Sequence, residues 1–503
     1  MHDLIVAVPK DGRPGYLRIA EGIRAAIQAE RVKPGERLPS SRALADMLGV
    51  HRHTVIAAMD ELVAEGWLEA GERRAHRVAN ELPSQFFSPK TRGKSSCLNR
   101  KLKWQFARQV NASDCGPDHA RASSYKYVFQ GGQPDLRLFP YDEFRACLAE
   151  SLRKSPSMRS GYGNPAGHAP FVERLSQYLS HMRALTGREI IVTHGTQEGV
   201  FLAAQLLIKP GDKVAVEALG YGAAWDAFRA AGGELVPIKV DENGMDPDSL
   251  EAMLGKHRIR FIYLTPHHQY PTTVTLTAAR RMRIYELASQ HQIPIFEDDY
   301  DHEFHYRCQP IAPLASIDPC ELVIYASTLS KIMFPSMRIG FLAVPQALYQ
   351  PLINLRAIIT RQNSVFLQDA VARWMDSGGF ERHLRRMRRA YQERRDALVG
   401  ALQDAQARGL PLEWAVPDGG MALWLNCNVD SDAVAQKVAE QGVYVAPESL
   451  YYCGAQRANT HLRLGFANQT PDEIRTGIGL LANAINNVQT NTLKTRRQKS
   501  ATR

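Results

Sequence analysis

A series of short apolar runs, each four or five residues long and bounded by Gly, Pro or polar turns, follows residue 129. Helical stretches separate these runs, which are Glu189–Thr193, Lys213–Glu217, Arg260–Leu264, Pro294–Glu297 and Leu322–Tyr325. Strands separated by helices pair through crossover connections, so the pattern predicts a mostly parallel sheet in an α/β domain. We expect this domain to occupy residues 128–485.

Residues 10–80 have a different pattern, in which short helices are closed by a hairpin. Apolar residues recur at helical spacing at Leu17, Ala20, Ile23 and Ile27. Further helix signals are the hydroxyls of Pro39-Ser40-Ser41, the inward Leu44 and Leu48, the terminating Gly49, and the inward Val55, Met59, Leu62 and Val63. The chain then passes Gly66-Trp67-Leu68 and enters a two-stranded wing that ends near Val78.

Two helices joined by a tight turn at Gly49-Val50 form a candidate helix-turn-helix, whose second helix enters the major groove of DNA. The N-terminus of the first helix suits a phosphate, because amides and hydroxyls are free to donate there. A compact three-helix unit can also bind nothing, and the pattern alone leaves both interpretations open. The candidate DNA-binding residues are Ser40, Ser41, Arg42, Arg52, His53, Thr54, Arg73 and Arg74.

The basic excess of the chain, +10 overall, is concentrated in two segments. Residues 81–127 carry nine Lys and Arg against three Asp and Glu, and residues 486–503 carry five against none. We interpret them as a basic linker and a basic tail that flank a near-neutral body. Such segments either contact nucleic acid or are simply solvated.

The 503 residues are enough for more than one core. The chain has no run of about 18 apolar residues and no signal-peptide pattern at its N-terminus, so we expect no membrane span. Its seven cysteines never form a C-x-x-C pair. This argues against a disulfide framework or a zinc site and favours the reducing cytoplasm.

The run Ser327-Thr328-Leu329-Ser330-Lys331 places a lysine directly after hydroxyl residues, with Arg338 seven positions later. A lysine that forms a Schiff base must be able to lose its proton, and a phosphate beside it requires a fixed cation and hydroxyl donors. A lone Ser-Lys pair is weak evidence, because most lysines are solvated.

Two further motifs strengthen this interpretation. In Glu297-Asp298-Asp299-Tyr300, at the end of an apolar run, a carboxylate can hold a pyridine nitrogen protonated and the tyrosine can bond the ring oxygen. A metal cluster with His302 and His305 is the alternative, which mixed ligands and an unfamiliar spacing disfavour. The turn Thr193-His194-Gly195-Thr196-Gln197 follows a strand and opens a helix, where free amides form a phosphate cradle.

These motifs resemble a known family. Residues 128–485 resemble the fold-type I aminotransferases, and the whole chain resembles the MocR-type subfamily of GntR transcriptional regulators, which joins a winged helix to such a domain. The N-terminal match is RVKPGERLPSSRALADMLGVHRHTVIAAMDELVAEGWLEA. The C-terminal matches include GGQPDLRLFP, GYGNPAGHAPFVERLSQYL, THGTQEGVFLAAQLLIKPGD, EDDYDHEFHY, STLSKIMFPSMRIG, HLRRMRRAYQERRDAL and HLRLGFA.

The resemblance implies that Lys331 holds pyridoxal 5'-phosphate as an internal aldimine, with Asp298 on the pyridine nitrogen and Tyr300 on the ring oxygen. Tyr221 would stack on the ring, and Tyr162 would reach the phosphate of the partner subunit in a head-to-tail homodimer. Arg463 would bind the carboxylate of an amino compound, with a structural ion pair as the alternative. The implied phosphate residues are Gly195, Thr196, Gln197, Thr328, Ser330 and Arg338.

Three positions depart from the family's patterns. Tyr270-Pro271-Thr272-Thr273 replaces the usual Asn-Pro-Thr-Gly, which removes one donor to the ring oxygen. Ala223 stands where regulators that answer to γ-aminobutyrate have a second arginine. Glu72-Arg73-Arg74-Ala75 replaces a wing turn of the Gly-Ser-Gly-Thr type.

The fusion predicts a cytoplasmic regulator that binds promoter DNA and senses a small amino compound through the Lys331 aldimine. An external aldimine would break the lysine link, so the ligand would distinguish two states, as a switch requires. Two alternatives stay open: a genuine aminotransferase with an appended helix-turn-helix, and a sensor of pyridoxal phosphate itself. We expect at most a half-reaction of transamination.

Overall fold

The computed structural model describes residues 8–9, 11–70, 76–83, 124–153, 161–306, 311–454 and 459–501, with side chains to residue 491. The chain divides into two compact units, residues 1–107 and 108–503. Among the described residues, no helix combines the length and the apolarity needed to cross a bilayer. The cysteines in these ranges, Cys147, Cys320, Cys427 and Cys453, are free thiols.

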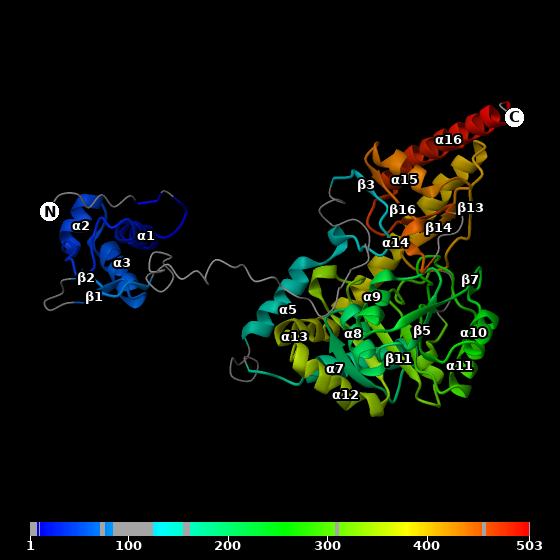
Figure 1. Cartoon of the computed structure of the whole chain (residues 1–503), viewed down its shortest axis with the longest axis horizontal. Helices are drawn as coiled ribbons and strands as arrows, with labels where there is room; N and C mark the ends of the chain where they lie inside the picture. Colours follow the sequence, from blue (N-terminus) through cyan, green and yellow to red (C-terminus); the bar gives the residue numbers. More distant parts are fainter. Residues whose placement is uncertain are drawn as a thin grey trace, which may run out of the picture. The chain divides into compact units, whose positions relative to one another are not determined.

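The N-terminal unit is a cluster of three helices with a short hairpin (Figure 1). Its elements are α1 (Gly15–Gln28), α2 (Ser41–Leu48), α3 (Arg52–Ala64), β1 (Leu68–Ala70) and β2 (His76–Val78). The two strands pair antiparallel, as the predicted wing requires. The predicted inward residues Ala20, Ile23, Ile27, Leu44, Val55, Met59 and Leu62 share one core, with Leu48 and Val63 packed against it.

Caps fix both ends of α2. The Ser40 side chain accepts a hydrogen bond from the Ala43 amide at 3.2 Å, which satisfies a donor that the helix start leaves unpaired. Gly49 ends α2 with a left-handed φ of +63°, a conformation that glycine adopts without strain. The wing turn, with Arg73 and Arg74, lies outside the described residues.

A seven-stranded sheet forms the centre of the C-terminal unit, in the order β4-β12-β11-β10-β9-β5-β6. Its strands are β4 (Glu189–Thr193), β5 (Lys213–Glu217), β6 (Glu234–Ile238), β9 (Ile259–Leu264), β10 (Ile295–Asp298), β11 (Val323–Thr328) and β12 (Gly340–Val344). β12 runs antiparallel to β11 and β4, and the other pairings are parallel. The predicted mostly parallel sheet is confirmed.

Helices cover both faces of this sheet (Figure 1). Because successive strand residues point to opposite faces, Ile191 of β4 packs in one cluster and its neighbours Ile190 and Val192 pack in another. The first cluster takes residues from α8 (Thr196–Leu207), α9 (Gly222–Ala230) and α12 (Gln346–Ile359). The second takes residues from α7 (Ala169–Arg183), α10 (Pro247–Leu254), α11 (Ala278–Gln290), α13 (Val365–Asp376) and α14 (Gly379–Ala407).

A smaller antiparallel sheet follows α14 along the chain. It consists of β13 (Glu413–Trp414), β14 (Ala422–Asn426), β17 (His461–Gly465) and β16 (Ala446–Pro447), with α15 (Ser431–Ala439) and α16 (Pro471–Ala501) beside it. The remaining elements are β3 (Tyr127–Val128), α5 (Tyr141–Arg153), β7 (Val240–Asp241), β8 (Gly244–Met245), β15 (Val443–Tyr444), and the 3-10 turns η4 (Leu136–Leu138), η5 (Leu314–Ile317), η6 (Pro335–Met337) and η7 (Glu448–Tyr451).

Two of the expected segment boundaries fall inside elements. α16 continues without interruption across residue 486, where we expected the basic tail to begin. β3 begins at the last residue of the expected linker and pairs in parallel with β15. Residues 84–123 of that linker, with the short helix expected around Lys101–Arg108, lie outside the described residues.

Replacing Ser40 with alanine should destabilise α2 by about 1 kcal/mol, because the Ala43 amide loses its acceptor. Hydrogen exchange of the first α2 amides in the full chain should then become roughly five-fold faster. Ser41→Ala is the matched control, since the Ser41 hydroxyl only accepts from Arg52 Nε at 3.3 Å. Equal acceleration in the two variants would contradict the capping role.

Candidate functional site

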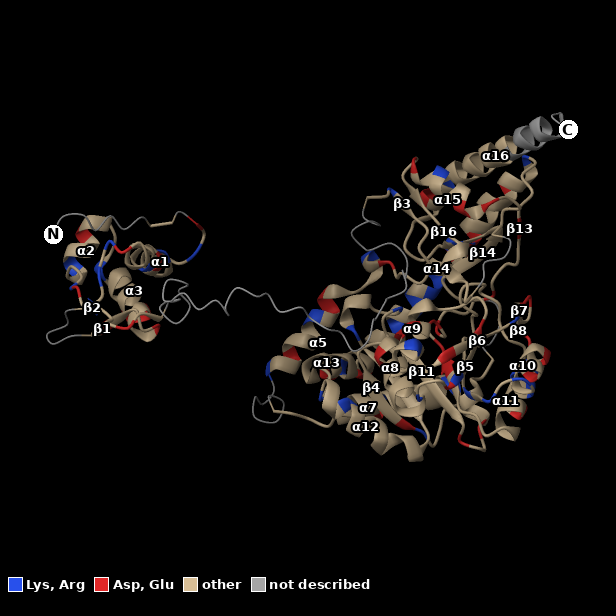
Figure 2. Ribbon diagram, viewed as in Figure 1, with Lys and Arg blue, Asp and Glu red and all other residues tan. Residues whose placement is uncertain are grey.

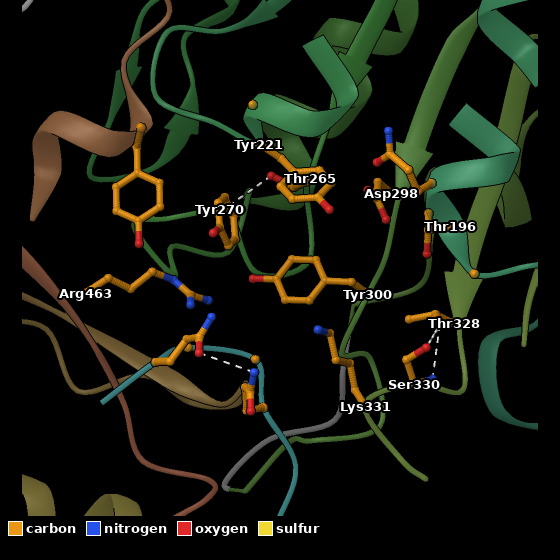
Figure 3. Close-up of a pocket in the computed structure, with 18 of the residues that line it drawn as sticks. Thr196, Tyr221, Thr265, Tyr270, Asp298, Tyr300, Thr328, Ser330, Lys331 and Arg463 are labelled. Carbon is orange, nitrogen blue, oxygen red and sulfur yellow. Dashed lines mark hydrogen bonds between the residues drawn. The ribbon is translucent and has the colours of Figure 1, made fainter. Parts of the chain in front are cut away.

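A cavity of about 580 Å³ in the C-terminal unit brings together eleven of the twelve residues predicted for the cofactor and the effector (Figure 3). The strands explain this convergence. β4, β10 and β11 run in the same direction and end at one edge of the sheet, where ligands of α/β proteins bind. The lining residues include Gly195, Thr196, Gln197, Tyr221, Asp298, Tyr300, Thr328, Ser330, Lys331, Arg338 and Arg463.

Lys331 follows β11 and points its amine into the cavity (Figure 3). Burial lowers the pKa of this amine to about 8, and the positive charges of Arg463 and Arg338 act in the same direction. Asp301 and Asp298 oppose that shift. A substantial fraction of the amine is therefore neutral near pH 8, which a nucleophilic lysine requires.

Asp298 is the last residue of β10 and is only 4% exposed. Its Oδ2 accepts a hydrogen bond from the Tyr263 hydroxyl at 2.8 Å, whereas its buried Oδ1 has no partner among the described residues. Burial is the largest cause that raises the pKa of this carboxyl to about 7. A cationic N–H in the cavity would satisfy the orphaned oxygen and reverse the shift.

The turn between β4 and α8 forms an anion cradle. Gly195 has φ +77° at the N-cap of α8, so the amides that begin the helix are free to donate. A Cβ at this position would lie 3.0 Å from the Arg338 guanidinium, which shows how closely the cation approaches the turn. The Thr328 hydroxyl donates to the Ser330 hydroxyl at 2.9 Å on the same side of the cavity.

Arg463, on β17, is 2% exposed and lies with its guanidinium 4.6 Å from the ring centroid of Tyr270. Its Nε has no hydrogen-bond partner among the described residues. Figure 3 shows the Tyr300 hydroxyl directed toward it. No carboxylate forms an ion pair with Arg463 within the described part of the chain, so the alternative of a structural ion pair receives no support there.

The segment Gln130–Gln133 also lines the cavity, and sequence reasoning assigned it no role. A Cβ on Gly131 would lie 1.4 Å from an Arg463 guanidinium nitrogen, and a Cβ on Gly132 would lie 3.2 Å from Lys331 Nζ. Only glycine allows this approach. The Gly-Gly pair in the GGQPDLRLFP stretch could have indicated this close approach from the sequence. Tyr263 and Tyr451 also line the cavity, and no sequence pattern indicated them.

Tyr270 and Tyr162, both singled out from the sequence, have different positions. Tyr270 replaces the expected asparagine and packs edge-on against Tyr221, Tyr300 and Tyr451, so it forms part of the cavity wall. Tyr162 does not line the cavity; it is 80% exposed, with the Arg361 guanidinium 4.8 Å from its ring centroid. Its reach into a partner subunit stays a prediction.

Asp299, the second carboxylate of the acidic run, lies in the core and does not line the cavity. It accepts hydrogen bonds from His302 Nδ1 at 2.7 Å and from the Tyr325 hydroxyl at 2.6 Å. His267 completes a buried trio whose possible ligand atoms lie within 4.8 Å of one another. His305, which the alternative metal cluster included, is not part of this trio.

In the N-terminal unit, the predicted DNA-binding residues within the described ranges lie at the starts of α2 and α3. Ser40, Arg42, Arg52 and His53 are exposed, and Ser41 and Thr54 are half-buried. Arg52 Nε donates to Ser41 Oγ at 3.3 Å, which connects the two helix starts. Cationic and hydroxyl groups therefore lie at the N-terminus of α3. This is the end of the second helix that a helix-turn-helix inserts into a groove of DNA.

Comparison with known proteins identifies both units. Residues 15–78 match the bacterial regulatory proteins of the gntR family, and residues 138–481 match the aminotransferase class I and II family. The probable rhizopine catabolism regulatory protein MocR of Rhizobium meliloti is 30% identical over 476 residues, which are 94% of each chain. The chain belongs to the MocR-type subfamily of GntR regulators.

Other relatives agree with this membership. The HTH-type transcriptional regulator TauR of Rhodobacter capsulatus is 29% identical to this MocR-type chain, over 93% of this chain and 96% of TauR. The crystal structure of Pyrococcus horikoshii kynurenine aminotransferase covers 79% of this chain and 97% of its own, with TM-score 0.69 and 27% identity. The chain is thus a transcription regulator that joins a GntR winged helix to a fold-type I aminotransferase domain, as predicted.

Pyridoxal phosphate is the cofactor of this MocR-type domain, and the cavity fits it. The orphaned Asp298 Oδ1, the Gly195 turn beside Arg338, and the Lys331 amine supply a cation acceptor, an anion cradle and a nucleophile. The cofactor supplies an aldehyde that condenses with primary amines and a ring that withdraws electrons.

Cofactor-free protein should capture pyridoxal phosphate faster as the pH rises from 7 to 9, with a midpoint near pH 8. The reason is that only the neutral Lys331 amine is nucleophilic, and its neutral fraction grows as the pH passes its pKa of about 8. Stopped-flow absorbance would measure the rate. Lys331→Ala should show no covalent capture, whereas Lys213→Ala, at the half-buried start of β5, should behave as the parent chain. A rate without pH dependence would contradict the assignment.

Proposed function

We propose that this regulator senses a small compound carrying both a primary amine and a carboxylate. Arg463 binds the carboxylate, and the amine is directed to Lys331. The observation that carries the proposal is the pair Gly131-Gly132, which contacts the Arg463 guanidinium with one residue and approaches Lys331 Nζ with the next. The two groups therefore lie beside adjacent residues of one segment, where a small amino acid can reach both.

The Arg463 guanidinium suits a carboxylate for two reasons. Its planar fork can donate two parallel hydrogen bonds, and its burial removes the competing water. The ring of Tyr270 stabilises the charge in the absence of an anion. Ala223 offers no second cation, and its carbonyl accepts from Gln197 Nε2 at 2.7 Å. We therefore assign no distal carboxylate to the effector at this position.

The same segment connects the cavity to the chain that leads to the winged helix. Tyr127 and Val128 pair with β15, whose Tyr444 lines the cavity. The Phe129 amide donates to the Tyr444 carbonyl and its carbonyl accepts from the Gly465 amide, both at 2.9 Å. We propose that a ligand on Arg463 displaces Gly131 and thereby changes the pairing of β3. Ligand occupancy then biases the segment that follows the linker in sequence.

For the winged helix, we propose that the start of α3 reads base edges while the start of α2 binds phosphate. The exposure of Arg52 and His53 and the position of Ser40 and Ser41 at the start of α2 support these roles. An aminotransferase activity is the second candidate, because the lysine, the carboxylate and the arginine of such enzymes share one cavity. Sustained turnover of an amino acid and a 2-oxo acid, at about 1 per second or more, would establish that activity.

Amino acids should perturb the visible absorption of the cofactor-bound protein at concentrations at least about 10-fold lower than matched amines that lack the carboxylate. The reason is that a charge-assisted bidentate bond to the carboxylate contributes about 1.5–3 kcal/mol. Arg463→Gln should abolish this preference. Arg229→Gln is the matched control, since Arg229 also lines the cavity but pairs with Asp226 at 3.1 Å. A preference that survives in Arg463→Gln would place the carboxylate elsewhere.

Gly131→Ala should separate cofactor binding from sensing. Its Cβ would overlap the Arg463 guanidinium, so the segment or the arginine must move. We expect retained cofactor absorbance, an amine response weakened at least about 10-fold, and faster hydrogen exchange at Tyr127 and Phe129 without any amine. Gly400→Ala, in open space on α14, is the control. Unchanged exchange at β3, both in this variant and in the parent chain with amine, would refute the coupling.

A further inference from the structure

One face of α14 carries a concentration of arginines that neither the cofactor site nor the core uses. Arg382, Arg385, Arg386 and Arg389 are exposed and line one surface depression together with Ala390 and Glu393. Blue segments along α14 mark this part of the chain in Figure 2. The spacing of three and four residues places the four guanidinium groups on one side of the helix.

These arginines differ from the others on the same helix in having few partners. On the inner side, Arg394 pairs with Asp135 at 2.7 Å and Arg395 donates to the Pro417 carbonyl at 3.1 Å. On the outer side, Arg382 pairs with Glu143. For Arg385, Arg386 and Arg389, no hydrogen bond or ion pair is formed with any residue that the structure describes.

The cluster is a local feature and does not reflect the average charge of the body. Residues 128–485 carry 36 Lys and Arg against 38 Asp and Glu. Like charges three and four residues apart also destabilise a helix by a few tenths of a kcal/mol per pair. Arg385 also lines a second depression, between α14 and α7, in which Arg174 pairs with Asp376 and Arg388 donates to the Glu303 carbonyl. An anion that bridges the arginines would remove their mutual repulsion.

We propose that this arginine face binds the phosphate backbone of duplex DNA, outside the sequence that the winged helix recognises. Residues 382 to 389 span about 10.5 Å of helix at 1.5 Å per residue. One DNA strand presents a phosphate every 3.4 Å of axis, so about three phosphates match this length. The guanidinium fork suits each phosphate, and the contact needs no particular base sequence.

The test is the salt dependence of DNA binding by the full-length, cofactor-bound protein. The probe is a 40-base-pair duplex of random sequence, because phosphate contacts do not depend on sequence. Each contact contributes about 0.9 to the slope of log K against log salt concentration. The triple variant Arg385→Gln/Arg386→Gln/Arg389→Gln should therefore lower the slope by about 2 to 3, and weaken binding at least 10-fold in low salt.

Two matched variants make the result decisive. Lys256→Gln/Arg258→Gln/Arg260→Gln removes the same charge from another exposed basic depression of the body and should leave the slope unchanged. Arg385→Lys/Arg386→Lys/Arg389→Lys keeps the charge and should keep most of the slope. Cofactor absorbance reports folding of all three. An unchanged slope in the Gln triple, or an equal fall in the Lys256 control, overturns the proposal.

Discussion

The carboxyl ends of β4, β10 and β11 meet at one edge of a buried sheet, and the Gly195 turn, Asp298 and Lys331 all depend on this arrangement. Inside the sheet the strands carry apolar side chains, so polar groups first become useful where the strands end. Burial at that edge has opposite effects on two charges. It lowers the pKa of the Lys331 amine and raises the pKa of the Asp298 carboxyl, because both groups lose water. Each is thereby poised to accept a partner from the cofactor.

Local patterns predicted much of this arrangement. The runs at β4 and β5 were matched residue for residue, and Gly195, Asp298 and Lys331 were found because each motif follows its strand directly. β11 extended three residues beyond the predicted run, since Ser327 and Thr328 are polar although they are buried in the sheet with Ala326. The contact of Gly131 with Arg463 could not be predicted, because more than 300 residues separate the two in sequence.

Arginine serves three purposes in this chain, and the surroundings decide which. Arg183 and Arg394 are buried against Glu303 and Asp135, where they hold the core together. Arg463 is equally buried but faces aromatic rings, so its charge is available to a ligand. The outer arginines of α14 are exposed and share one face. A count of charges along the sequence does not separate these cases, because only the folded chain shows which guanidinium groups already have an anion.

The parallel pairing of β3 with β15 has a consequence for how amine binding and DNA binding affect each other. Under the proposed coupling through this segment, thermodynamic reciprocity holds: whatever factor the amine imposes on operator affinity, the operator imposes on amine affinity. A regulator seated on its promoter and a free copy in the cell would then differ in their sensitivity to the same metabolite. Operator DNA would then act as an effector of the aminotransferase-like domain.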